Sequence, residues 1–597
     1  MIAMNTEWNL SVLYENLQDP AYEKDFEALE AMRANVGRLA SAMREKGDKA
    51  PDAGQTEEIL ETLRQTDLLF SRLGIYQGLV LATDSKNGEM MAQESRLMRI
   101  RSDFTGDLTT LRKALGRIEN LDEMCRESAM IREHRAYLHR SIDENRYLLD
   151  ESAEEMIAAM NMTGASAWEN LRSFLASTLK VDYEGRTVTL SEVRNLAYDP
   201  DKEVRRKAYE AELESYEKIQ DSVAFALNHI KNQSAMLAKM RGYESPLDMA
   251  LRDSWMKRET LDALMEAVRE YLPAFRKYMR AKAKYMGYEN GLPWYELFAP
   301  LGSFDRTFSL EEAGQCLQEV FGKLSPDMAE LMREAFEKEW IDFYPRDGKE
   351  GGAFCCELPD RDESRVLTNF DGTFGAVDTL AHELGHAFHN RMIYRESLLN
   401  RSYPMPVAET ASTFNEIHLC SEILAGAKSD EERLALLEND LREKNQCIVD
   451  IYSRYLFETD VFDKCSEAFL MADDLNGMML AAQEAAYGDG LDPEFKNSGM
   501  WICKSHYYME SIDFYNFPYA FGNLFAQGLY AMYRREGEDF MKRYREMLRL
   551  TGVHTIEEDG AMMGADLTDT KFWKDSLQMI SEEIDEFCRL SANITKA

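Results

Sequence analysis

The segment His382-Glu383-Leu384-Gly385-His386 places two histidines four positions apart, although histidine occurs only nine times in the 597 residues. On an α-helix, positions i and i+4 lie on one face, so His382 and His386 can bind a single metal ion. Imidazole nitrogens suit Zn²⁺, and a catalytic zinc site keeps one position open for a water, whose pKa the metal lowers to about 7. Glu383 points about 100° away from His382 around the helix, which fits a base beside the metal rather than a ligand.

A third ligand has to come from elsewhere in the chain. Metzincin peptidases supply a further histidine shortly after the first two. Here His389 stands where their pattern requires glycine, and Met392 stands where it requires the histidine, so that class is excluded. A downstream carboxylate is the alternative, and the candidates are Glu396, Glu409 and Glu416.

Two of these candidates lie in the segment PVAETASTFNEIHLCSEILAGA, which is predicted to be a helix that begins at Pro406. Its apolar residues indicate that a carboxylate on this helix is half-buried and needs a partner. This pattern favours Glu409 as the third ligand and Glu416, two turns later, as an acceptor that orients a ligand. Glu396 is expected to be an exposed charge at a helix end.

Two residues close to the histidine pair have alternative interpretations. Asp378 lies four positions before His382 and could orient its imidazole, or it could simply favour the start of the helix. His389 lies three positions after His386 and could support the site or line the cleft, or it could pack in the core.

Three blocks of sequence carry a resemblance to a known family. HELGHAFH (residues 382–389) and ETASTFNE (409–416) are followed by a block rich in histidine and tyrosine, SHYY at 505–508 and FYNFPYAFG at 514–522. Together they resemble the thimet-oligopeptidase-like zinc peptidases, and specifically the oligoendopeptidase F branch. The resemblance covers roughly residues 180–580, and the three blocks are far more specific than the histidine pair alone.

This resemblance implies a mainly α zincin-type fold with an N-terminal helical lobe, a small β-sheet near the active site and a deep substrate channel. It implies one Zn²⁺ per chain bound by His382, His386 and Glu409, with Glu383 as general base. It also implies that His506, Tyr515 and Tyr519 face the scissile carbonyl; either tyrosine could be the hydroxyl donor, with Tyr519 favoured.

The function expected from these features is a zinc-dependent endopeptidase that hydrolyses oligopeptides with a zinc-activated water. The resemblance implies short, unfolded peptides as substrates, because the family's site lies inside a channel. The alternative is a catalytically inactive peptide-binding protein on the same scaffold. A strand predicted at residues 353–356 could pair with an extended peptide by β-augmentation, or it could be an internal strand.

These residues need a framework, and the composition indicates a helical one. Gly (33) and Pro (14) are few for 597 residues, which predicts mainly α-helix, and the length predicts more than one domain. A β-hairpin is expected around Glu184-Gly185. We expect an N-terminal helical lobe over residues 1–200, with this hairpin near 179–190, and a catalytic zinc peptidase domain over 201–597. Glycines and short apolar runs between residues 341 and 374 predict the small sheet.

The charge and the cysteines indicate where such a protein acts. With 70 basic and 107 acidic residues the net charge is −37, which argues against binding to nucleic acid. The nine cysteines are scattered, as expected for reduced thiols. Neither a signal peptide nor an apolar run that could span a bilayer is evident. We therefore expect a cytoplasmic protein without a membrane partner, and the oligomeric state is left open.

Overall fold

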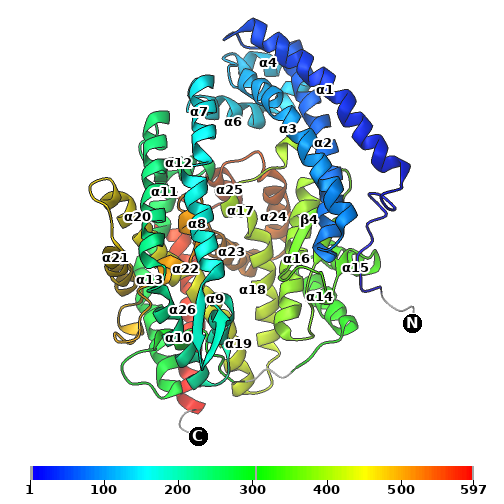
Figure 1. Cartoon of the computed structure of the whole chain (residues 1–597). Coiled ribbons are helices and arrows are strands. Elements are labelled where there is room, and N and C mark those ends of the chain that lie inside the picture. The colour runs from blue at the N-terminus through cyan, green and yellow to red at the C-terminus, as the bar shows by residue number, and fades with distance from the viewer. Residues whose placement is uncertain (1–4, 303–305, 595–597) are drawn as a thin grey trace.

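The computed structural model describes residues 5–302 and 306–594, and most of these residues are helical (Figure 1). Its strands form one two-stranded and one three-stranded sheet. The expected mainly α fold with small sheets is thus confirmed. The buried apolar side chains form three clusters, each of which holds together a different part of the molecule.

The first cluster holds the N-terminal helices together, at the upper right in Figure 1. Helical spacing brings Leu63, Phe70 and Leu73 to its buried face. The rings of Tyr14 and Tyr22 pack edge to face with centroids 5.1 Å apart. The helices of this lobe are α1 (Pro20–Lys46), α2 (Ala53–Thr83), α3 (Gly88–Leu115), α4 (Leu121–Glu127), α5 (Ala129–Glu133) and α6 (Arg135–Asn145).

The second cluster joins the predicted hairpin to helices from both halves of the chain. The hairpin pairs Lys180 with Thr189, and its turn residues Glu184 and Gly185 have φ of 48° and 76°, as a type I′ turn requires, so this prediction is confirmed. The elements of this lobe are α7 (Glu151–Asn161), α8 (Ala165–Thr178), β1 (Lys180–Tyr183), β2 (Arg186–Thr189), α9 (Leu190–Asn195), η1 (Leu196–Tyr198), α10 (Lys202–Tyr216), α11 (Gln220–Arg241), α20 (Ile451–Cys465), α21 (Ala472–Tyr487), α22 (Met500–Cys503) and η6 (Ser505–Tyr508).

The third and largest cluster connects the two lobes and contains the helices that carry the histidine pair. Its elements are α12 (Pro246–Asp253), α13 (Arg258–Met286), η2 (Trp294–Glu296), α14 (Leu310–Leu324), α15 (Pro326–Glu337), β3 (Ile341–Asp342), β4 (Phe354–Glu357), β5 (Ser364–Leu367), α16 (Phe374–Ile393), η3 (Leu398–Asn400), α17 (Met405–Ala408), α18 (Thr410–Ala425), α19 (Asp430–Asn445), η4 (Gln446–Asp450), η5 (Gly488–Gly490), α23 (Phe517–Glu536), α24 (Glu538–Leu550), α25 (Ile556–Met563) and α26 (Thr570–Ile594).

The predicted sheet has the strand order β3-β5-β4, with β3 parallel and β4 antiparallel to β5. Strand β4 therefore lies at an edge and pairs with the chain on one side only. The amide nitrogen of Asn390, on α16, donates to Ser364 Oγ at 3.1 Å and contacts Cys355 Sγ at 3.7 Å. These contacts hold the edge strand against the helix that carries the histidine pair.

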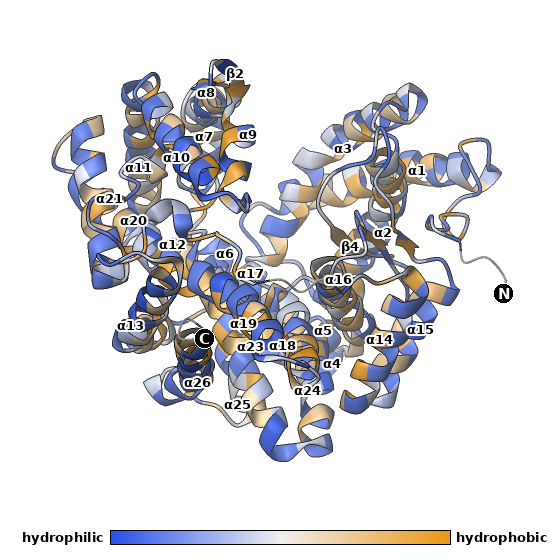
Figure 2. Ribbon diagram, turned by 90° about the horizontal axis from the view of Figure 1, so that it is seen from below, coloured by the Kyte–Doolittle hydropathy of each residue, from blue (hydrophilic) through white to orange (hydrophobic). Residues whose placement is uncertain are grey.

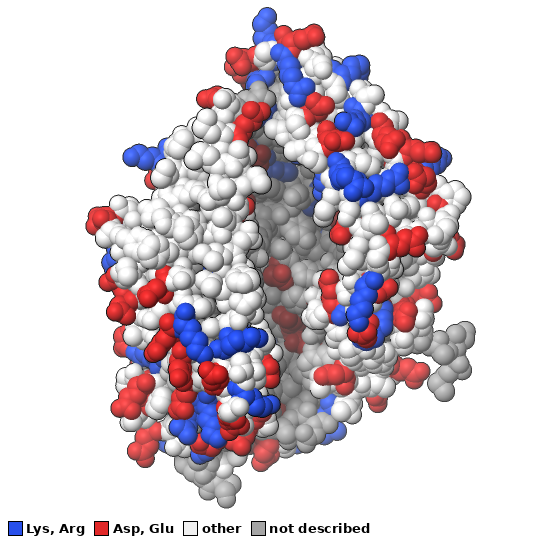
Figure 3. Space-filling model, viewed as in Figure 1, with Lys and Arg blue, Asp and Glu red and all other residues white. Residues whose placement is uncertain are grey.

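A deep cleft runs between the two lobes (Figure 3). Seen from below, α1–α3 and the α7–α13 group stand on opposite sides, and α18, α23 and α24 lie between them (Figure 2). Acidic side chains are visible inside the cleft (Figure 3). The apolar clusters of the two lobes separate between residues 138 and 165 of the chain, whereas the domain boundary at residue 200 stays a prediction.

The structure bears on two predictions about the cellular environment, which concern membrane spans and disulfides. No helix in residues 5–302 and 306–594 is long and apolar enough to cross a membrane. All nine cysteines are free, so none of them forms a disulfide within the described part of the chain.

Candidate metal centre and active site

Helices α16 and α18 cross at a very short distance because α16 carries a glycine at the crossing. A Cβ atom on Gly385 would lie 2.6 Å from both the Ala411 carbonyl oxygen and the Ser412 Cα, and these are backbone atoms that cannot yield. Beside this contact, Asn415 Nδ2 donates to the Ala381 carbonyl at 3.0 Å. The close crossing brings the start of α18 next to the histidines of α16.

The predicted helix beginning at Pro406 is in fact two helices, which corrects that expectation. The short α17 ends at Ala408, and α18 begins at Thr410. Glu409 lies between them with φ −90° and ψ 4°. The hydroxyl of Ser412 donates to Glu409 Oε2 at 2.7 Å and holds the carboxylate in place. The break therefore turns this side chain toward α16.

His382, His386 and Glu409 form a triangle of potential ligand atoms. His382 Nε2 lies 3.2 Å from His386 Nε2, and Glu409 Oε2 lies 3.2 Å and 3.3 Å from these two nitrogens. Donor atoms bound about 2.0–2.1 Å from a tetrahedral zinc are about 3.3–3.4 Å apart. The three atoms thus have the spacing that zinc requires, and three protein donors leave the fourth position that a catalytic site needs.

Two carboxylates surround His382. Its Nδ1 lies 2.9 Å from Glu416 Oε1, while its Nε2 faces Glu409. Burial lowers the pKa of His382, but Glu409 and Glu416 outweigh it and raise that pKa to about 11. Conversely, burial raises the pKa of Glu409, but the two histidines hold it well below its usual range. The site therefore favours positive charge, whether a proton or a metal ion.

The remaining candidates near the motif lie outside this triangle. Glu416, rather than Asp378, contacts His382 Nδ1, and within the described residues Asp378 Oδ1 has no hydrogen-bond partner. His389 is fully buried, stacks on Tyr403 with ring centroids 4.4 Å apart and bonds Thr551 Oγ1 at 2.8 Å. It is a packed core residue.

Glu396 is not the exposed charge that was expected. Its carboxylate pairs with Arg549, and its side chain is only 15% exposed. Because the carboxylate of Glu396 is engaged by Arg549, it is not available as a third ligand.

Glu383 has the surroundings of a proton acceptor. Its side chain is buried, with 6% exposure, and follows His382 on α16. Burial raises the pKa of Glu383, and the neighbouring His382 and His386 partly oppose this rise. A carboxylate with a raised pKa binds a proton more readily than an exposed glutamate does.

The tyrosine-rich block forms a ring cluster between η6 and the start of α23. His506 stacks on Tyr515 with centroids 4.8 Å apart, and Tyr519 lies 6.0 Å from His506 and 5.8 Å from Tyr515. Tyr519 is on the first turn of α23, one turn before Gly522, whose Cβ position lies 3.4 Å from Glu409 Cβ. The face of α23 that carries Tyr519 therefore packs next to the third candidate ligand.

Several supporting residues were not found by sequence analysis. Ser412 and Gly385 set the position of Glu409, and Arg454 donates to Asn516 Oδ1 at 3.2 Å behind the tyrosine block. Ser412 follows Glu409 by three positions, a spacing typical of a side chain that bonds back along a turn. That signal could have revealed its role, whereas Arg454 has no local signal because its partner is 62 residues away.

Comparisons with known proteins identify the family of this chain. The pattern of peptidase family M3 matches residues 195–579, which include all three sequence blocks. An oligoendopeptidase F homolog of Lactococcus lactis subsp. lactis is 25% identical over 74% of each chain. Oligopeptidase PepF of Bacillus subtilis is 22% identical over 99% of this chain and 88% of its own.

A solved structure of a Chlamydophila abortus protein has the same fold, with a TM-score of 0.86, 20% identity and 98% of both chains covered. The family expected from the three sequence blocks is thereby confirmed. The chain belongs to peptidase family M3, within its oligoendopeptidase F branch.

Proposed function

We propose that this peptidase is a zinc-dependent endopeptidase that cleaves short, unfolded peptides inside the cleft. The observation that carries the proposal is the triangle of His382, His386 and Glu409 donor atoms, 3.2–3.3 Å apart, with Glu383 beside it on α16. One zinc per chain fits these donors, and when bound it would activate a water and polarise the peptide carbonyl.

Three residues of the chain would then have separate roles, as proton carrier, as support for a ligand and as hydrogen-bond donor. Glu383 would take a proton from the attacking water and deliver it to the amine of the leaving peptide. Glu416, 2.9 Å from His382 Nδ1, would hold that imidazole in the tautomer that leaves Nε2 free as a ligand. Burial, and then the neighbouring Tyr515, raise the pKa of Tyr519, so its hydroxyl stays protonated and can donate to the oxyanion.

The substrate would lie as an extended chain along β4. This strand pairs with β5 on one side only, and α16 lies against it through Asn390. An edge strand offers backbone donors and acceptors to a peptide of any sequence, which suits an enzyme for many short substrates. The cleft between the lobes favours chains that are already unfolded.

Removal of the metal tests this function directly. Dialysis against a chelator should abolish cleavage of a quenched fluorescent peptide, and added Zn²⁺ should restore it as the metal content returns to one per chain. Full activity in metal-free protein would contradict the zinc mechanism. Zinc-loaded protein that binds peptides without cutting them would instead support the alternative, an inactive peptide-binding protein.

Tyr519→Phe deletes one hydroxyl and almost no volume. Tyr519 is 37% exposed, whereas Tyr515 is half-buried and stacked on His506, so Tyr519 is better placed to reach a substrate. We expect kcat to fall about 10²–10³-fold, as for loss of one oxyanion donor, with little change in KM or zinc content. Steady-state kinetics with Tyr515→Phe in parallel decide the assignment. A normal kcat in Tyr519→Phe and a low one in Tyr515→Phe would make Tyr515 the donor.

We further propose that the enzyme works in the cytoplasm, with residues 1–200 and 201–597 as N-terminal lobe and catalytic domain. Nine free cysteines suit a reducing compartment. Fractionation of the source cells tests the location, because activity in an extracellular fraction would contradict it. Limited proteolysis tests the boundary, because it should cut first near residue 200.

A further inference from the structure

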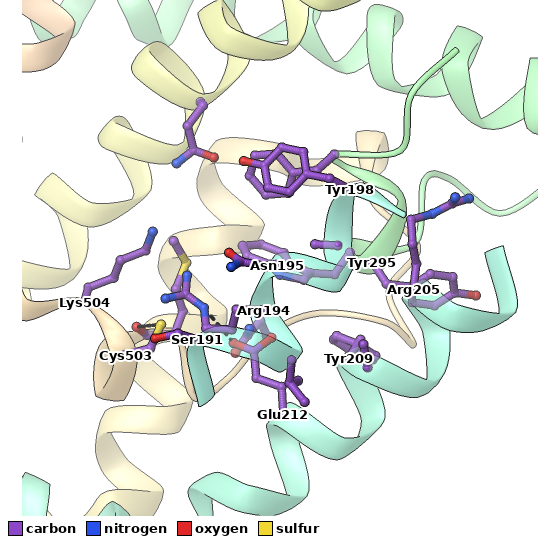
Figure 4. A pocket seen from close by; sticks show the side chains of 18 of the residues that line it. Ser191, Arg194, Asn195, Tyr198, Arg205, Tyr209, Glu212, Tyr295, Cys503 and Lys504 are labelled. Atoms are coloured by element: carbon purple, nitrogen blue, oxygen red, sulfur yellow. Dashed lines mark hydrogen bonds and ion pairs between the residues drawn. The ribbon is translucent and has the colours of Figure 1, made fainter. Parts of the chain in front are cut away.

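A pocket of about 400 Å³ lies in the lobe built on the second apolar cluster (Figure 4). Its walls come from α9, α10, η1 and η2, together with α19 and the end of α22. Aromatic rings line part of it, and two of them, Tyr198 and Phe298, have centroids 5.1 Å apart. A volume of this size accommodates one or two amino-acid side chains.

Most of the charged side chains of this pocket already have a partner. They form three ion pairs, Arg194 with Glu212 at 3.2 Å, Arg205 with the buried Glu296 at 2.9 Å, and Glu443 with Arg442 at 3.4 Å. Each pair contributes no net charge. The charge of each of these residues is therefore already balanced by an opposite charge beside it.

Lys504 is the exception. It lines the pocket at the end of α22, and Figure 4 shows its side chain beside that of Arg194. Within residues 5–302 and 306–594, its ammonium has no hydrogen bond or ion pair. Burial, followed by the positive charge of Arg454, lowers the pKa of Lys504. A half-buried ammonium of this kind gains stability when an anion enters the pocket.

The pocket is close to the candidate active site. Lys504 precedes His506 by two residues, so their Cα atoms are at most about 7 Å apart. On another wall, burial raises the pKa of Glu443, Arg442 opposes this rise, and the charge of Glu416, which contacts His382, adds to it. A peptide bound with its scissile bond at His506 would therefore have the Lys504 pocket as a neighbour.

We propose that the Lys504 pocket is a substrate subsite that binds a carboxylate of the peptide. The proposal rests on the peptidase function above and adds a preference for one charge at one substrate position. The carboxylate belongs either to an acidic side chain or to the C-terminus of the peptide. An ammonium facing a single carboxylate in a half-buried pocket forms a charge-assisted hydrogen bond, which is stronger than a neutral one.

The test compares two sets of matched peptides on the zinc-loaded full chain. The first set holds one Glu/Gln pair for each position on either side of the cut bond, and the second is one pair that ends in a free carboxylate or an amide. Wild type should prefer the charged member of one pair by about 10–100-fold in kcat/KM, and Lys504→Met should abolish that preference. Preference within the first set identifies a side chain, and preference within the second identifies the C-terminus.

Two control variants make the result specific. Lys504→Arg should keep the preference, and Lys202→Met, which removes an exposed lysine of α10 outside the pocket, should behave as wild type. Calorimetry of peptide binding to Glu383→Gln, with and without Lys504→Met, reports the same contact without turnover. If wild type cleaves the peptides with no charge preference, or Lys504→Met keeps the same preference, the subsite is wrong while the peptidase function stands. If wild type cleaves none, the function itself fails.

Discussion

Glu383→Gln should retain zinc and lose at least about 10²-fold in kcat. The glutamine side chain fills the same volume but cannot accept a proton, and positioned acid–base groups contribute about 10²–10⁴-fold. Glu383 is buried at 6% exposure beside His382, and this burial raises its pKa. The measurement is steady-state cleavage of one peptide, together with metal analysis of the same preparation.

The control for this variant is a glutamate of the neighbouring helix. Glu422 lies on α18 and pairs with Lys323, outside the candidate site. Glu422→Gln should therefore keep nearly normal kcat and zinc. If Glu383→Gln turns over as fast as Glu422→Gln with zinc bound, another group is the base, and Glu383 has a structural role only.

Glu409→Ala should lose both zinc and activity. Glu409 Oε2 is the atom that both imidazoles face, at 3.2 Å and 3.3 Å, so its removal leaves two ligands where a catalytic zinc needs three. Glu416→Ala removes only the partner of His382 Nδ1 and should weaken zinc binding by about 10–100-fold. Titration against a chromophoric chelator of known affinity measures both effects.

The opposite result for the two variants would reverse the roles assigned to Glu409 and Glu416. Zinc retained in Glu409→Ala and absent from Glu416→Ala would make Glu416 the ligand and Glu409 its support. Thermal unfolding of the metal-free proteins is the control for misfolding. Both variants should unfold at temperatures close to metal-free wild type, because the alanine leaves the α16–α18 contact at Gly385 intact.

The local features of this protein could be predicted from the sequence by itself. The four-residue spacing of His382 and His386 identifies a shared helical face, because a helix repeats every 3.6 residues. Alternating apolar and polar residues around Glu184-Gly185 predict the hairpin, and Gly185 readily adopts the positive φ that its turn needs. Three sequence blocks also identified the family, because together they are far more specific than the histidine pair alone.

Only the tertiary structure decided how distant segments meet. Glu409 and Glu416 were both acceptable ligands on one predicted helix. The helix break at Glu409 and the close crossing at Gly385 separate their roles, because they turn one carboxylate to the imidazole Nε2 atoms and the other to Nδ1. No local pattern encodes such a crossing, which depends on side chains that pack across the whole core.

Lys504, in the second lobe, is another residue whose environment cannot be predicted from its neighbours in the sequence. Lys504 is one of many lysines in the sequence, and nothing in its neighbours indicates an unpaired charge. Its environment comes from α9, α10 and α19, which are far from it along the chain. The sequence by itself determined the residues and the helices that carry the chemistry. The folded chain decided which charges are paired, which are buried and which face the cleft, because these properties depend on contacts between segments remote in sequence.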